Sequence, residues 1–304
     1  MRRRSILWLV PVALLACREQ SQPSVQPPSA PPKPPTAAPA DVSHGEAAVG
    51  SPGEPAAIDP AAPPRSDRRR HRVRIEITHK KLTIADGVTY DAWTFDNRVP
   101  GPVLRVTEGD TVDFTLVNRA PMPHSLDFHA AEIAPVALHI ANGMYGAIIV
   151  DPRQGRPAAK EFVFVQSEFY TKTLADSTRM IDWEKLLGLA PDYVVFNGRE
   201  AEYAHHPIPV RVGERLRLYI VNAGPNRFSA FHVVGAIFDR VYLDGSLAHP
   251  LEGVQTVTVP VGGGAIFETR LVEKGTYPFV SHAFADATKG AVGMFEARTG
   301  SGVP

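Results

Sequence analysis

Residues 122–146 read MPHSLDFHAAEIAPVALHIANGMYG and hold a high density of side chains that can bind a metal ion. His124, His129 and His139 supply three imidazoles, and Met122 and Met144 supply two thioethers. Imidazoles suit several transition metals, and thioethers favour copper in particular. The stretch therefore predicts a copper site. It contains no cysteine, so the predicted site lacks the thiolate that a blue-copper centre needs.

The one cysteine of the chain, Cys17, belongs to the N-terminal segment. A single cysteine excludes a disulfide within the chain and leaves no other thiolate for a metal. Three arginines at 2–4 precede the apolar run 6–15, which is too short to cross a bilayer and fits an export signal. The run leads into Leu-Leu-Ala-Cys, which resembles a bacterial lipoprotein box. We expect residues 1–17 to be a lipoprotein-type export signal and Cys17 to be the lipidated residue.

The residue after Cys17 bears on where the exported protein stays. It is Arg18, and not the aspartate associated with retention in the inner membrane. The expected product is a bacterial lipoprotein of the periplasm, anchored by its lipid in the outer membrane.

Composition separates a long N-terminal spacer from the folded part. Residues 18–70 are dominated by Pro, Ala, Ser and Gln, with few large apolar side chains, so we expect a disordered linker. The whole chain of 304 residues is 44% hydrophobic, which is enough for two ordinary domains. Its 32 basic residues balance 32 acidic ones, so the charge gives no indication of a nucleic-acid partner.

After residue 72 the apolar side chains alternate with a period of two. The clearest runs are Val73, Ile75 and Ile77, then Val112, Phe114 and Leu116, then Leu216, Leu218 and Ile220. Turn residues separate these runs at short intervals, so the sequence predicts an all-β chain of sandwich type. One helix is predicted near residues 180–187, where Trp183 and Leu187 share a face with Met180 that would pack on the core.

An internal repeat shows that the first half of the fold is shorter than the second. Residues 104–118 align with 208–222 at an offset of 104, whereas residues 142–147 align with 289–294 at an offset of 147. The first copy is therefore 43 residues shorter between these landmarks. In the second copy the interval contains alternating segments, at 238–242, 254–259, 265–271 and 276–281. We predict a first sandwich that lacks strands and exposes sheet edges. Its stability would then depend on contacts with the second sandwich or with another subunit.

Three motifs of the first half carry a family resemblance. They are Val99-Pro100-Gly101-Pro102 with Glu108-Gly109-Asp110, then the segment from Met122 to His129, then the segment from His139 to Met144. Together they resemble two-domain cupredoxin proteins of the copper nitrite reductase and multicopper oxidase superfamily. The resemblance covers about residues 72–300 and implies two cupredoxin-like Greek-key β-sandwich domains, the first of them truncated. The expected boundaries are 71–155 for the truncated domain and 156–300 for the second.

The resemblance also implies a role for each candidate ligand. His124, His139 and Met144 fall where the family's type 1 electron-transfer copper takes two imidazoles and a thioether. The type 1 cysteine, together with a neighbouring histidine of the type 2 catalytic copper, falls in the missing segment. Both copper centres are therefore predicted to be present only as incomplete remnants.

Three further residues match the catalytic copper of the family. His129 falls on one type 2 ligand position, and His282 resembles the ligand that a neighbouring subunit of a homotrimer supplies. Asp127 matches the aspartate that hydrogen-bonds nitrite and delivers protons. Ile237 stands where we expect the other active-site histidine, and His232, on an alternating strand, is interpreted more readily as a core residue than as a ligand.

Two functions remain open from the sequence. The first is an exported copper oxidoreductase resembling nitrite reductase, with impaired activity, which takes electrons from a periplasmic donor and reduces nitrite or another small molecule. The second is a non-catalytic cupredoxin-like lipoprotein that holds copper or serves as a binding scaffold. A damaged reading frame is a third possibility, because Glu132-Ile133-Ala134-Pro135 runs directly into Val136-Ala137-Leu138-His139. The mass of the mature protein would separate this last case from the others.

Overall fold

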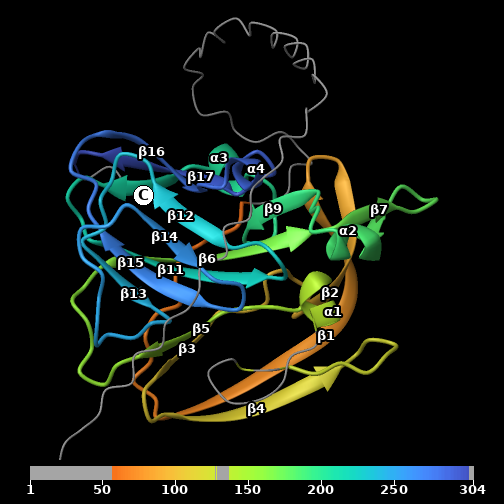
Figure 1. Ribbon diagram of the computed structural model, residues 1–304. Coiled ribbons are helices and arrows are strands. Elements are labelled where there is room, and N and C mark those ends of the chain that lie inside the picture. The colour runs from red at the N-terminus through yellow and green to blue at the C-terminus, as the bar shows by residue number, and fades with distance from the viewer. Residues whose placement is uncertain (1–56, 127, 129–136, 301–304) are drawn as a thin grey trace, which may run out of the picture. The chain divides into compact units, whose positions relative to one another are not determined.

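The computed structural model describes residues 57–126, 128 and 137–300 and shows two β-sandwiches (Figure 1). The predicted site residues Cys17, Asp127 and His129 lie outside these described residues. No helix within the described ranges is long and apolar enough to cross a membrane. The all-β prediction is confirmed, because the described elements are mostly strands arranged in several sheets.

The first sandwich consists of a five-stranded sheet and a two-stranded sheet. The order of the larger sheet is β4 (Thr111–Asn118), β1 (Arg70–Ala85), β2 (Val88–Phe95), β8 (Arg179–Ile181) and β7 (Thr171–Thr173). The smaller sheet pairs β3 (Leu104–Thr107) with β5 (Ile148–Asp151) in parallel. Between β4 and β5 the structure describes the short helix α1 (Ala137–Ala141).

The second sandwich has two five-stranded sheets. One has the order β10 (Ile208–Arg211), β17 (Val292–Arg298), β16 (Gly275–Ser281), β12 (Ser229–Val233) and β14 (Thr256–Val259). The other has the order β13 (Arg240–Leu243), β15 (Gly264–Thr269), β11 (Leu216–Gly224), β6 (Lys160–Phe169) and β9 (Tyr193–Phe196). Its core is rich in fully buried phenylalanines, among them Phe164, Phe231, Phe267, Phe279 and Phe295. Three short helices accompany it: α2 (Trp183–Leu187), α3 (Glu202–His205) and α4 (Phe284–Ala287).

The helix predicted near residues 180–187 is shorter than expected and turns a different face inward. Asp182 caps α2 by accepting a hydrogen bond from the Lys185 backbone N–H, so the helix begins only at Trp183. Trp183 and Leu187 are 47% and 64% exposed, whereas Leu186 is buried. The prediction that Trp183 and Leu187 pack on the core was wrong, because a helix of five residues buries only about one position.

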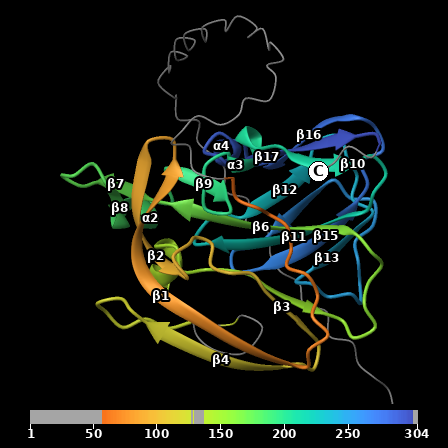
Figure 2. The same cartoon turned by 180° about the vertical axis from the view of Figure 1, so that it is seen from behind.

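The truncation of the first sandwich is visible in its strand pairing. Strands β3, β4 and β5 correspond by the repeat to β10, β11 and β17. In the second sandwich β11 lies between β15 and β6, but within the described residues β4 pairs only with β1 and forms the edge of its sheet (Figure 2). No residue of β4 is fully buried, whereas seven of the nine residues of β11 are. Strand β4 is thus amphipathic, but among the described residues it lacks a paired strand on the side where β15 pairs with β11.

Two segments cross the boundaries expected from the sequence. Residues 57–69 belong to the predicted linker, yet the Ala62 N–H donates to the Glu161 carbonyl at 3.1 Å and Ala61 forms a bridge to Phe162 of β6. Strand β8 comes after residue 155 but pairs with β2 of the first sandwich. The boundary at residue 155 stays a prediction, and both observations show the two sandwiches sharing chain segments.

Buried charges also join the two sandwiches. Arg105 of β3 donates to Asp151 of β5 at 2.7 Å and to Glu161 of β6 at 2.7 Å. Arg217 of β11 donates to the same Glu161 at 2.6 Å and to Glu268 of β15 at 2.8 Å. The Arg105 and Arg217 side chains are each 4% exposed. We call these five residues the interdomain charge network, and Glu161 is its central acceptor.

The network makes the stability of the fold depend on pH. Burial acts to raise the pKa of Glu161, but hydrogen bonds from Arg105 and Arg217 outweigh it and leave the pKa below its usual value. A carboxyl with a depressed folded pKa stabilises the fold above its unfolded pKa of about 4.3, and this contribution is lost as the pH falls through the lower folded pKa. We therefore expect the urea midpoint of unfolding to fall between about pH 6 and pH 3. Glu161→Gln should flatten this dependence, and an equal slope in both proteins would contradict the assignment.

Candidate metal centre

The three predicted type 1-like residues lie together at the open side of the first sandwich. His124 lies in the segment after β4, His139 lies in α1, and Met144 follows α1 by a tight turn. The Met144 N–H donates to the His139 carbonyl at 3.0 Å, which fixes these two residues relative to each other. Gly143 makes the turn possible, because its φ is +115° and a Cβ there would lie 2.6 Å from the Val99 side chain.

The indole ring of Trp93, on β2, contacts the rings of both candidate histidines. Its ring centroid lies 4.9 Å from that of His124 and 5.6 Å from that of His139, both in edge arrangements. A third histidine, His79 of β1, stacks on the same indole at 5.2 Å and 7°. We call His79, His124 and His139 the histidine cluster. The sequence reasoning missed His79 and Trp93, which pair across β1 and β2.

Several ring nitrogens of the cluster are buried and have no hydrogen-bond partner among the described residues. They are Nδ1 of His124 and both Nδ1 and Nε2 of His139. The His124 and His139 ring centroids are 5.0 Å apart. Burial, with a smaller contribution from the neighbouring His139 and His79, lowers the pKa of His124 below its ordinary value. His124 is therefore neutral at pH 7, which is the form that binds metals.

These donors fit a soft metal ion but not a complete blue-copper centre. Burying an imidazole nitrogen without a partner costs free energy of folding. A metal ion removes this cost when it binds the lone pair of the nitrogen. Met144, which is 4% exposed and whose backbone N–H donates to the His139 carbonyl, is the candidate that would supply a thioether. Over the described ranges, no three residues of the types His, Cys, Asp and Glu are placed to hold one ion. The set that the structure offers is thus two imidazoles and a thioether.

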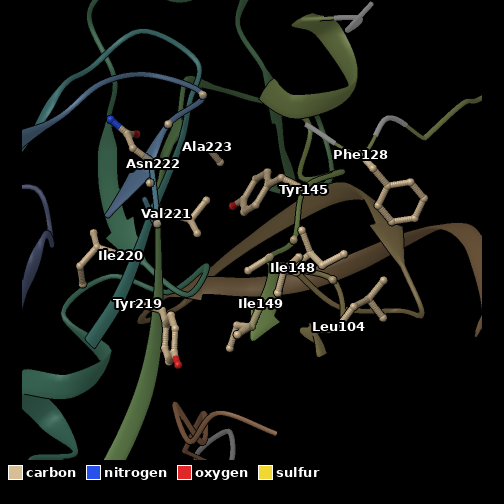
Figure 3. Close-up of a pocket in the computed structure, with 18 of the residues that line it drawn as sticks. Leu104, Phe128, Tyr145, Ile148, Ile149, Tyr219, Ile220, Val221, Asn222 and Ala223 are labelled. Atoms are coloured by element: carbon tan, nitrogen blue, oxygen red, sulfur yellow. The ribbon is translucent and has the colours of Figure 1, made fainter. Parts of the chain in front are cut away.

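A cavity of about 790 Å³ opens beside this centre, and His139 and Met144 are among the residues that line it. Figure 3 shows Tyr145, Ile148 and Ile149 on one wall and Tyr219 and Val221 of β11 on another. The lining is largely apolar, as expected where a sandwich lacks some of its covering strands. The cavity therefore reaches from the first sandwich to the face of the second, next to the candidate ligands.

The predicted type 2-like residue His282 lies elsewhere, directly after β16 in the second sandwich. Its ring is 5.2 Å from that of His232 on β12, which pairs with β16. The Nδ1 atom of His232 lies 2.8 Å from the Gln255 carbonyl oxygen, and because a carbonyl can only accept, Nδ1 carries the proton. His282 is exposed, and among the described residues no third His, Cys, Asp or Glu is placed to hold a metal ion together with His282 and His232. This site alone does not fit a bound copper.

One interpretation of this region was wrong. His232 is not a core residue, because it is only partly buried and lies between the buried Phe231 and Val233. Ile237 is 56% exposed, and its place at the position of the family's histidine stays a prediction. The period-two alternation of residues 231–233 could have shown that His232 faces outward.

The fold and the donor set define a cupredoxin-type protein of the multicopper oxidase class, and a family model described as multicopper oxidase matches residues 76–137. The copper-containing nitrite reductase of Neisseria meningitidis serogroup B is 39% identical to this chain, covering 78% of it and 72% of the relative. The enzyme of the same description from Alcaligenes xylosoxydans xylosoxydans is 30% identical, covering 70% and 82%. The chain belongs to the copper-containing nitrite reductase family.

The solved structures agree with this assignment. The copper nitrite reductase from Nitrosomonas europaea matches with a TM-score of 0.69 and 33% identity, covering 75% of this chain and 94% of that one. The alignment with the Neisseria meningitidis relative runs over 281 residues, which is longer than the 78% of this 304-residue chain that it covers. Such a difference is expected when the relative carries a segment that this chain lacks.

Proposed function

We propose that this chain is an exported copper-binding member of its family in which nitrite reduction is impaired. His124, His139 and Met144 would hold the copper ion, and the observation that carries the proposal is the set of buried ring nitrogens without partners. A copper ion in such a set supplies a one-electron redox centre of soft character. Around it Met144 is buried, and Trp93 contacts both histidine rings edge-on, so the protein's own side chains hold the donors in place.

Impairment of the nitrite reaction follows from the ligands that this chain has. The relatives are described as copper-containing nitrite reductases, which supports nitrite as substrate and an electron donor as partner. The single cysteine is Cys17 in the N-terminal segment, so the type 1-like set has no thiolate. His282 is the one predicted type 2-like ligand among the described residues. The two donor sets are thus short of what electron transfer and substrate binding require.

A copper holder without catalysis is the second candidate. The cavity beside His139 and Met144 favours it, because it opens the candidate ligands to small molecules or to another protein surface. Export as an outer-membrane lipoprotein through Cys17 and assembly as a homotrimer complete the proposal. The trimer is supported by an exposed apolar side chain beside His282: Phe284 is 74% exposed, and its ring centroid lies 5.1 Å from that of His282.

Copper stoichiometry tests the proposal directly. We expect protein loaded with copper(I) and freed of excess metal to retain stoichiometric copper by elemental analysis. The double variant His124→Ala/His139→Ala should fall to background, because it removes both imidazoles of the set. Circular dichroism would confirm that this variant folds.

The matched control is His205→Ala/His249→Ala, which removes two exposed histidines of the second sandwich. It should retain the wild-type copper content. Equal copper in both double variants would assign the metal to other sites, and no copper in the wild type would leave a binding scaffold as the function.

A further inference from the structure

The third member of the histidine cluster, His79, has no assigned role. Its Nε2 atom lies 3.0 Å from the Nε2 atom of His124, across 45 residues of sequence. His79 is itself held firmly, since it stacks on Trp93 and pairs with it across β1 and β2. The imidazole ring of His79 is therefore held in place beside the Nε2 atom of His124, a candidate copper ligand.

Only one of the two facing nitrogens can carry the shared proton. A neutral imidazole has one N–H and one lone pair, so the direction of this hydrogen bond fixes the tautomer of His124. If His79 donated, the proton of His124 would be on Nδ1, where the structure shows a buried atom without a partner. A buried N–H without an acceptor costs on the order of 1–3 kcal/mol.

The opposite direction leaves a buried lone pair in place of a buried N–H, and only the lone pair can bind a metal ion. If His124 donates from Nε2, its buried Nδ1 atom carries this lone pair, and both ring nitrogens of the neighbouring His139 are also buried without a partner among the described residues. His79 then keeps its own proton on Nδ1, and because the residue is only partly buried, that N–H can meet water. Metal-binding histidines commonly use their second nitrogen in this way, usually toward a carboxylate or a carbonyl.

We propose that His79 is a positioning residue: it accepts a hydrogen bond from Nε2–H of His124 and holds His124 in the tautomer whose Nδ1 is free for a metal ion. The tautomer itself is a property of the metal-free protein, and its consequence for copper rests on the proposed function. His79 touches no candidate metal position in this role, and it acts through His124 alone.

Nitrogen NMR of the metal-free, full-length protein tests the tautomer. In the wild type, two-bond proton–nitrogen spectra should show His124 protonated at Nε2 and bare at Nδ1. His79→Leu should abolish this fixed state, whereas His79→Gln should keep it, because the glutamine amide oxygen can accept the same hydrogen bond. Protonation of His124 at Nδ1 in the wild type would overturn the proposal.

Copper affinity gives the second measurement. With copper(I) competed by a colorimetric chelator, His79→Leu should bind about 10–100-fold more weakly, and His79→Gln should stay close to wild type. His249→Leu, an exposed histidine of the second sandwich, is the control and should change nothing. If His79→Leu leaves both the tautomer and the affinity unchanged, the role fails. A wild type that shows the expected tautomer but binds no copper instead overturns the proposed function and supports the role of His79.

Discussion

Copper-loaded protein supplied with a chemical reductant is expected to produce nitric oxide from nitrite no faster than free copper at the same concentration. Its visible spectrum should lack the intense thiolate-to-copper band of a blue-copper centre. Both results follow from the donors, since fast electron transfer through a type 1 centre needs two imidazoles and a thiolate. The candidate set has two imidazoles and a thioether, and the one cysteine of the chain is Cys17, in the N-terminal segment.

The size of the loss can be bounded from known metal sites. Removing a group that merely supports a ligand typically costs about 10–100-fold in metal affinity or activity, so removing ligands themselves should cost more than about 100-fold. The nitrite reductase of Neisseria meningitidis, assayed in parallel, is the positive control. An intense visible band, or nitric oxide production within about tenfold of that control, would contradict the predicted gap in the first sandwich.

The strands were readable from the sequence because their burial is one-sided. Alternation at Val73, Ile75 and Ile77 places one face of β1 in the core, and the structure buries Ile75 and Ile77. The length difference between the repeats likewise carried over to the sheets, where β4 ends as an edge while β11 is an interior strand. Strand alternation is a local pattern, and the length of a repeat is a count of residues. Both can therefore be read directly from the sequence.

The features that the sequence did not reveal depend on register between distant strands. His79 meets His124 because β1 passes under the segment after β4, and no spacing rule along the chain encodes that contact. His232 meets His282 only through the pairing of β12 with β16. Family motifs thus predicted candidate ligands, whereas the partners that tertiary contact supplies were not predicted.

Arg105→Leu is expected to destabilise the protein by about 3–5 kcal/mol, the usual cost of removing one partner from a buried ion pair. The arginine is 4% exposed and donates to Asp151 and Glu161, so its loss leaves two buried carboxylates short of their counter-charge. Burial alone lowers the pKa of Arg105, but the bonds to these two carboxylates hold it above its ordinary value. Urea unfolding followed by tryptophan fluorescence measures the effect, with Trp93 reporting on the first sandwich.

The matched control is Arg240→Leu, which breaks an ion pair with Glu252 whose side chains are 54% and 62% exposed. An exposed pair is screened by solvent and contributes little to stability, so this variant should unfold close to wild type. Adding Asp151→Leu and Glu161→Gln to Arg105→Leu should recover part of the loss, because the two carboxylates that lost Arg105 as a partner disappear with it. Equal effects of Arg105→Leu and Arg240→Leu would show that the truncated sandwich does not depend on the interdomain charge network. A large loss that the triple variant does not recover would assign the effect to packing of the arginine stem, since the charges would then be absent from both states.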